Sequence, residues 1–286
     1  MQFFEIFQLG LLKSLYLRRV FSTMALYFHG NAPLKFQHQY LVTRDYIIPY
    51  LEKNGGWKEN MTVLEIGCGE GGVLKAFVEK GCICTGMDLS TSKIENGKTL
   101  QQSEIESGKL ELFSADIYDQ STMDAFRGKF DLIILKDTIE HIPDQERVMS
   151  QLQVYMKPGG KLFFAFPPWR MPFGGHQQTA TTKKGQMPWM HLLPRSTYAA
   201  YLKSIGEPQP TIDSLMEIYD TRISIDRFEN ILKKTGYKIH HRRLYLINPI
   251  YRFKFNWSPR PQFPIISSIP WFRDFVSTTA YYILER

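Results

Sequence analysis

The chain has 286 residues, of which 43% are hydrophobic, and a formal net charge of +7 at pH 7. This length and composition suit one large domain, or a core with a sizeable addition, and permit a true hydrophobic core. The positive charge fits an anionic substrate, a membrane surface or nucleic acid, and equally a basic surface that faces water. The three cysteines, Cys68, Cys82 and Cys84, make no disulfide framework and indicate a reducing compartment.

Residues 1–30 form an apolar N-terminal segment. Its stretch 3–17 is interrupted by Glu5 and Lys13, so it falls short of the ~20 largely uncharged residues of a membrane span. It also lacks the basic start and the small-residue cleavage site of a signal peptide. Three interpretations stay open: an amphipathic helix on a membrane, such a helix docked on the protein, or sequence upstream of a true start at Met24.

The stretch from Val63 to Gly72 organises the next part of the chain, after a helix expected at 36–51. An apolar run ends at Glu65, and glycines then follow in close succession. This pattern predicts a buried strand, a turn whose backbone passes close to a ligand, and a helix over 73–80. Strand, glycine turn and helix open a nucleotide-binding βαβ unit. The glycines also fit the dinucleotide pattern G-x-G-x-x-G, so this motif alone does not exclude a dinucleotide.

Further apolar runs alternate with helical patterns and predict an α/β fold with a doubly wound sheet. The strands are expected at 62–66, 82–87, 110–113, 130–135 and 162–166. Prolines and glycines follow, and residues 169–220, rich in Trp, Met, His and Pro, are interpreted as an inserted cap. A helix is expected at 225–235, with closing strands at 237–247 and 279–284. An aromatic and basic loop lies between those two strands.

The order of motifs over residues 60–168 resembles the class I S-adenosylmethionine-dependent methyltransferases. The resemblance is carried by Val63 to Gly71 with Glu65, by Asp88 and Asp116 after the next two strands, by Asp131 to Leu135 followed by Glu140-His141-Ile142, and by Met156 to Gly160. It implies a Rossmann-like mixed sheet of seven strands with the last strand antiparallel. It also divides the chain into a cofactor-binding core at 31–168, a substrate cap at 169–220, and a closing helix and strands at 221–286.

The resemblance implies S-adenosyl-L-methionine as the cofactor and points to the residues that hold it. Asp88 can accept hydrogen bonds from both ribose hydroxyls, and Glu65 can orient the ammonium of the amino-acid tail. Asp116 or the Ile117 amide can address the adenine. The expected cofactor-binding residues are Glu65, Gly67, Cys68, Gly69, Gly71, Asp88, Leu89, Asp116, Ile117 and Lys136.

Methyl transfer to a hydroxyl needs an aligned acceptor and a group that removes its proton. His141, just after the fourth strand, and His176, on a glycine-flanked loop after the fifth, are the candidate catalytic residues. His176, Trp189 and His191 are the candidate substrate contacts. No metal is expected, because the histidines lack a ligand spacing along the chain and no cysteine cluster accompanies them.

The sequence therefore predicts an S-adenosylmethionine-dependent methyltransferase, most simply O-directed, that acts on a small, lipid-linked or glycan acceptor. The segment Lys136-Asp137-Thr138-Ile139 stands where a base-methylating enzyme would carry an Asn-Pro-Pro-Tyr type motif, so nucleic acid is not expected as a partner. Two alternatives stay open: an NAD(P)-dependent oxidoreductase and a non-catalytic cofactor-binding adaptor. The expected location is cytoplasmic, with peripheral contact to the inner face of a membrane as an option.

Overall fold

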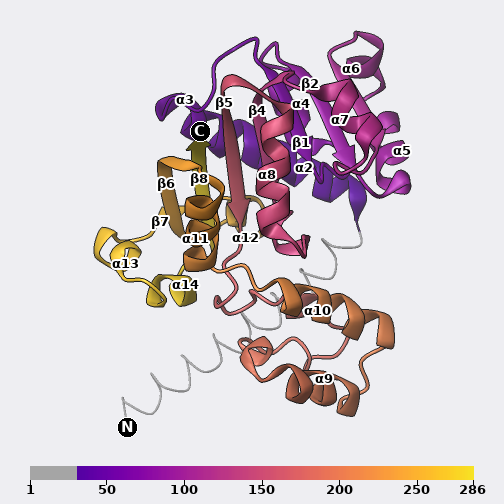
Figure 1. The fold of residues 1–286 in the computed structure, drawn as a ribbon. Coiled ribbons are helices and arrows are strands. Elements are labelled where there is room, and N and C mark those ends of the chain that lie inside the picture. The colour runs from indigo at the N-terminus through magenta and orange to yellow at the C-terminus, as the bar shows by residue number, and fades with distance from the viewer. Residues whose placement is uncertain (1–30) are drawn as a thin grey trace.

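A computed structural model describes residues 31–286, so the interpretations of the segment 1–30 lie outside the described residues. One eight-stranded sheet forms the centre of the fold, with helices on both faces (Figure 1). The strand order is β3-β2-β1-β4-β5-β8-β6-β7. The strands are β1 (Thr62–Ile66), β2 (Ile83–Asp88), β3 (Leu110–Ser114), β4 (Phe130–Lys136), β5 (Met156–Phe166), β6 (Lys238–Ile247), β7 (Arg260–Pro261) and β8 (Thr279–Glu285).

The doubly wound sheet predicted from the sequence is confirmed, and the strand count differs by one. Strands β1 to β5 are parallel, and β8 lies antiparallel between β5 and β6. The additional strand is β7, a two-residue edge strand that pairs with β6. Two residues are too few to show a period-two pattern, so β7 could not be predicted from the sequence.

Helices cover the two faces of the sheet and build two hydrophobic cores. One core packs α2 (Ala32–Val42), the following turn, α3 (Ile48–Lys53) and α4 (Gly72–Val78) on side chains such as Val63 and Phe163. The other packs α8 (Gln145–Tyr155) and α11 (Ile225–Thr235) on side chains such as Leu64 and Phe164. Because both faces are covered, the central strands are continuous apolar runs. The remaining helices beside the sheet are α5 (Thr91–Leu100), α6 (Gln102–Glu106), α7 (Gln120–Phe126), α12 (Tyr251–Phe255), α13 (Pro264–Ser268) and α14 (Phe272–Val276).

The segment after β5 has a hydrophobic core of its own. It contains α9 (Arg195–Ser204) and α10 (Gln209–Thr221), which extend below the sheet in Figure 1. Trp169, Tyr198, Leu215 and Tyr219 are among the residues that fill this third core. Within residues 31–286 no helix combines the length and the apolar character that crossing a membrane requires.

Asp274 joins three segments that are distant in the sequence. It is 0% exposed. One of its carboxylate oxygens accepts a hydrogen bond from the Ile225 amide at 2.8 Å, and the other accepts one from the Arg170 amide at 3.0 Å. The Arg170 guanidinium lies 3.4 Å from the second oxygen. Asp274 therefore fixes the start of α11 and the entry to the cap relative to α14.

We predict that Asp274→Asn lowers the free energy of unfolding by about 1–3 kcal/mol, because the amide cannot accept from both backbone donors and pair with Arg170. Chemical denaturation followed by circular dichroism measures this loss. Asp124→Asn, at an exposed position on α7, is the matched control and should change stability by less than about 0.5 kcal/mol. Equal stability of the two variants would contradict the role assigned to Asp274.

Candidate functional site

The glycine turn after β1 is built by close contacts with protein and by one open position. Gly67, Gly69 and Gly71 have positive φ angles of 73°, 55° and 80°, which favour glycine. A side chain at Gly67 would lie 2.6 Å from the Thr138 side chain, and one at Gly72 would lie 2.5 Å from the Phe36 carbonyl oxygen. At Gly69 the nearest atom is Lys93 Cδ at 3.9 Å. The sequence pattern predicted that the backbone of this whole turn approaches a ligand. Among these glycines, only Gly69 has open space where a side chain would stand.

Glu65, the penultimate residue of β1, is a buried carboxyl group. Its side chain is 2% exposed, and its Oε2 has no hydrogen-bond partner among residues 31–286. Burial raises the pKa of Glu65 well above its ordinary value, and the nearby Lys136 only partly offsets this effect. An unsatisfied buried carboxyl group is costly unless a donor reaches it. Glu65 therefore fits a ligand that brings an ammonium group to this edge of the sheet.

Asp88 ends β2 and connects the glycine turn to the next helix. One carboxylate oxygen accepts a hydrogen bond from the Gly69 amide and the other from the Ser90 amide, both at 2.9 Å. Each oxygen retains a second lone pair that can accept from a hydroxyl. The next residue, Leu89, leaves 74% of its apolar side chain exposed. Asp88 is thus held in place for a diol, beside an uncovered apolar surface.

Asp116 and Ile117 lie at the end of β3. Asp116 accepts a hydrogen bond from the Tyr118 amide at 2.9 Å, and the buried Ile117 offers its carbonyl to the Tyr155 hydroxyl at 2.6 Å. These bonds fix the backbone of the loop and leave the Asp116 side chain half-buried at the surface. Cys68 is buried within the glycine turn, and burial raises the pKa of its thiol well above the usual range.

Lys136 and Asp137 form an ion pair at the end of β4. Lys136 is 7% exposed, and its ammonium lies 2.5 Å from the Asp137 carboxylate. Asp137 has a positive φ of 53°, so the chain turns sharply here. Desolvation would raise the pKa of Asp137, but the Lys136 ammonium lowers it below its ordinary value. The Lys136 side chain therefore pairs with Asp137 and does not extend into solvent.

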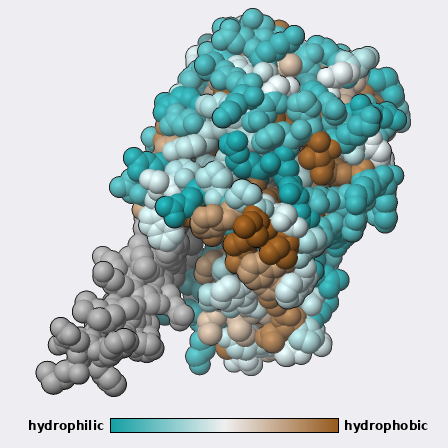
Figure 2. Space-filling model, turned by 90° about the vertical axis from the view of Figure 1, so that its left-hand side faces the viewer, coloured by the Kyte–Doolittle hydropathy of each residue, from teal (hydrophilic) through white to brown (hydrophobic). Residues whose placement is uncertain are grey.

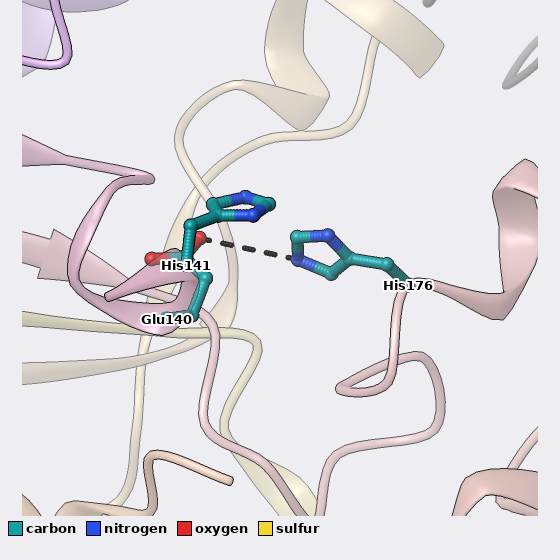
Figure 3. A group of neighbouring side chains, drawn as sticks. All are labelled: Glu140, His141 and His176. Carbon is teal, nitrogen blue, oxygen red and sulfur yellow. Dashed lines mark ion pairs between the residues drawn. The ribbon is translucent and has the colours of Figure 1, made fainter. Parts of the chain in front are cut away.

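Glu140, His141 and His176 meet at the carboxyl ends of β4 and β5 (Figure 3). Glu140 and His141 belong to a short 3-10 turn after β4, and His176 comes from the loop after β5. His176 Nε2 lies 3.9 Å from Glu140 Oε1, and the two histidine rings stand edge to face with centroids 5.2 Å apart. The two candidate catalytic residues are therefore neighbours, together with the carboxyl group of Glu140, which the sequence analysis named only as part of a motif and not as a catalytic candidate.

The charges in this group are set by burial and by neighbouring ions. Glu140 is 2% exposed, and neither of its carboxylate oxygens has a hydrogen-bond partner among the described residues. Burial raises the pKa of Glu140 well above its ordinary value, and the charge on Asp137 raises it further. Desolvation lowers the pKa of His141, which Asp137 opposes. The lowered pKa favours the neutral imidazole of His141, and the raised pKa favours the protonated carboxyl group of Glu140.

These three side chains are also the set that could hold a metal ion in the described part of the chain. Their donor atoms all lie within 4.8 Å of one another. Ligand atoms about 2.1 Å from a single ion lie roughly 3–3.5 Å apart, so the group would have to contract to bind one. That this group works without a metal ion is a proposal, which chelation tests.

The structure separates the candidate substrate contacts. Trp189 is 47% exposed, with a positive φ of 61°. His191 is 0% exposed, and its two ring nitrogens face the Gln177 amide at 2.7 Å and the Trp169 carbonyl at 2.6 Å. Burial lowers the pKa of His191 to about 4. His191 therefore holds the cap together as a neutral side chain and does not reach an acceptor.

Two lysines that the sequence did not suggest lie close to the site. Lys254, on α12, is near enough to Asp137 and Lys136 for their charges to affect it. Desolvation lowers the pKa of Lys254 to about 8, with Asp137 acting in the opposite direction. The positive charge of Lys35, on α2, lowers the pKa values of both Glu65 and His141. No local motif marks either lysine, because each belongs to a helix that is distant in sequence from the glycine turn.

Comparison with known proteins places this geometry in a family. A family profile described as "Methyltransferase domain" matches residues 36–242. The ubiquinone biosynthesis O-methyltransferase of Coxiella burnetii (strain Dugway 5J108-111) is 38% identical over 103 residues, which are 36% of this chain and 42% of that protein. The enzyme of the same name from Histophilus somni (strain 2336) is 26% identical over 135 residues, 47% of this chain and 56% of the relative. The chain thus spans about half the length of the curated relatives it matches.

Solved structures show the same fold at low sequence identity. Geranyl diphosphate C-methyltransferase from Streptomyces coelicolor A3(2), solved with S-adenosyl-L-homocysteine, superposes with a TM-score of 0.52 at 13% identity over 83% of this chain and 77% of that one. An S-adenosylmethionine-dependent methyltransferase from Mesorhizobium loti gives 0.50 at 13% identity, over 83% and 96%. Because the family profile covers most of its length, the chain belongs to the methyltransferase domain family.

Proposed function

We propose that this protein transfers a methyl group to a hydroxyl of a small, lipid-linked or glycan acceptor. The meeting of His141, His176 and Glu140 beside the glycine turn carries the proposal. Family membership argues against the NAD(P)-dependent alternative. The O-directed chemistry agrees with the names of the curated relatives, and it is a proposal for this chain.

S-adenosyl-L-methionine fits the donors at the sheet edge. Glu65 has a buried, unsatisfied oxygen for the tail ammonium, Asp88 has lone pairs for the ribose hydroxyls, and Leu89 offers an apolar surface beside the adenine position. Gly69 leaves backbone without a side chain next to these groups. When bound, the cofactor supplies a methyl group activated by its sulfonium.

The protein's own task is to orient the acceptor hydroxyl and remove its proton. A neutral His141 or His176 accepts that proton on a ring nitrogen. His176 Nε2 lies 3.9 Å from Glu140 Oε1, so an ionised Glu140 would stabilise the positive charge that His176 gains with the proton. Trp189, on the cap, stays the proposed acceptor contact together with His176.

Family membership does not by itself establish turnover, so the adaptor alternative is decided by assay. Radiolabelled S-adenosylmethionine incubated with the protein and with lipid, quinone and glycan extracts should label one acceptor fraction. Label in none of these fractions, with cofactor binding intact, would support a binding role instead.

We predict that Asp88→Ala weakens binding of S-adenosylhomocysteine about 10- to 150-fold, because a charged hydrogen bond is worth about 1.5–3 kcal/mol. Isothermal titration calorimetry measures the affinity. Asp88→Asn keeps one acceptor oxygen for the Gly69 or Ser90 amide and should lose less affinity than Asp88→Ala. The difference between the two variants separates support of the loop from binding of the ribose. Asp124→Ala is the control, and affinity unchanged in Asp88→Ala would refute the assignment.

We predict that His141→Ala or His176→Ala lowers turnover about 10²- to 10⁴-fold while S-adenosylhomocysteine still binds, as expected for loss of a general base. Label transfer to the acceptor measures turnover. His240→Ala, on β6 away from the site, should keep full activity. If His141 is the base, its lowered pKa keeps it neutral to lower pH, so the acid limb of the rate should lie below 6.5. Full activity in both site variants would leave neither histidine as the base.

We predict that dialysis against EDTA leaves turnover within about twofold, because Glu140 Oε1 and His176 Nε2 lie 3.9 Å apart, wider than the roughly 3–3.5 Å between two ligands of one ion. Activity before and after dialysis, with metal content by mass spectrometry, tests this. Loss of activity that Mg²⁺ or Zn²⁺ restores would instead make this group a metal site.

A further inference from the structure

Five large apolar side chains are exposed close together in the segment that contains α13 and α14. They form what we call the apolar platform: Phe263, Ile265, Ile269, Trp271 and Phe272, exposed by 56%, 77%, 43%, 57% and 41%. Brown side chains gather on the face shown in Figure 2, which is the side of the molecule where α13 lies in Figure 1. Monomeric proteins seldom expose such a group without a partner.

Polar contacts behind the platform hold it in place. The Trp271 amide donates to the Asp226 carboxylate at 2.7 Å, and the Arg273 guanidinium pairs with Asp226 at 2.6 Å and with Glu229 at 2.8 Å. Arg242 reaches the Ser267 carbonyl at 3.3 Å. Trp271 itself has a positive φ of 63°, a strained conformation for a bulky residue. The fold thus accepts strain while it keeps an indole ring at the surface.

The charge around the platform selects its partner. Arg242 and Arg273 are neutralised by Glu229 and Asp226, so the positive charge available to a partner comes from other side chains. The exposed Arg260 comes three residues before Phe263, and the exposed Arg252 lies on α12. Tryptophan and phenylalanine at an apolar face with exposed arginines nearby are typical of segments that rest in the headgroup region of an anionic bilayer.

The sheet register places the platform at the carboxyl ends of the parallel strands, where the candidate catalytic residues also lie. Ala280 pairs with Phe166 at the carboxyl end of β5, so α14, which directly precedes β8, lies at that edge. Glu140, His141 and His176 lie at the carboxyl ends of β4 and β5. A membrane in contact with the platform would therefore lie at the same end of the strands as Glu140, His141 and His176.

We propose that the apolar platform docks the protein on an anionic lipid bilayer, so that a lipid-linked acceptor reaches the site from the membrane surface. This inference rests on the proposed function and deepens it by naming the surface that meets the lipid. The bilayer contact is peripheral: the side chains enter the headgroup region and no helix crosses.

Flotation of the full chain with vesicles tests the proposal. The wild type should float with vesicles of phosphatidylcholine and phosphatidylglycerol, and more weakly with phosphatidylcholine alone. Ile265→Ser and Trp271→Asn should each reduce the bound fraction, and the double variant should reduce it at least about tenfold. Trp271→Asn removes the ring, and circular dichroism checks that the variant keeps the fold at this positive φ. Ile83→Ser is the matched control, since Ile83 is 57% exposed on β2, and should float like the wild type.

Binding of S-adenosylhomocysteine is measured on the same samples. A wild type that binds it but does not float, or variants that float undiminished, overturns the docking surface and leaves the proposed function standing. A wild type that floats but does not bind it overturns the proposed function instead. A wild type that dimerises through the platform, with a monomeric Ile265→Ser and no flotation, overturns the proposal in favour of a second copy.

Discussion

The candidate site depends on the contact between the glycine turn and the loop after β4. Thr138 occupies the space that a side chain at Gly67 would need, and its hydroxyl donates to the Ile66 carbonyl at 3.2 Å. This contact presses the β4 loop against the end of β1. Asp137, Glu140 and His141 are thereby held beside the turn that Asp88 supports from the other side. A larger residue at Gly67 would separate the candidate cofactor-binding residues from the candidate catalytic ones.

Positions that follow from the ends of strands could be predicted from the sequence. Glu65, Asp88 and Asp116 each follow an apolar run, and parallel strands bring their carboxyl ends to one edge. The order of these motifs also led to the family that the comparison shows. What could not be predicted is how segments without regular structure fold back. His141 and His176 were separate candidates, and only the structure makes them neighbours.

The cap shows why loop composition is a weak guide. His191 lies in a segment rich in Trp, Met and Pro that suits both a binding surface and a small core, and the two uses have the same composition. Its burial against Trp169 and its contact with Gln177 place it in the core. The glycine pattern is ambiguous in a similar way. It predicts tight turns, but it does not show whether the space beside each glycine is filled by protein or left for a ligand. Lys254 enters the site from α12, which no motif of the core includes.

The position of β8 has a consequence for how the chain folds as it is synthesised. Strands β5 and β6 are not neighbours; each pairs with β8, which comes after both in the chain. Until residues 279–285 emerge from the ribosome, β5 has an unpaired edge and β6 has no strand that joins it to the sheet. The nascent protein therefore exposes an open edge beside apolar side chains until its last strand arrives, and chaperone protection matters most during that interval.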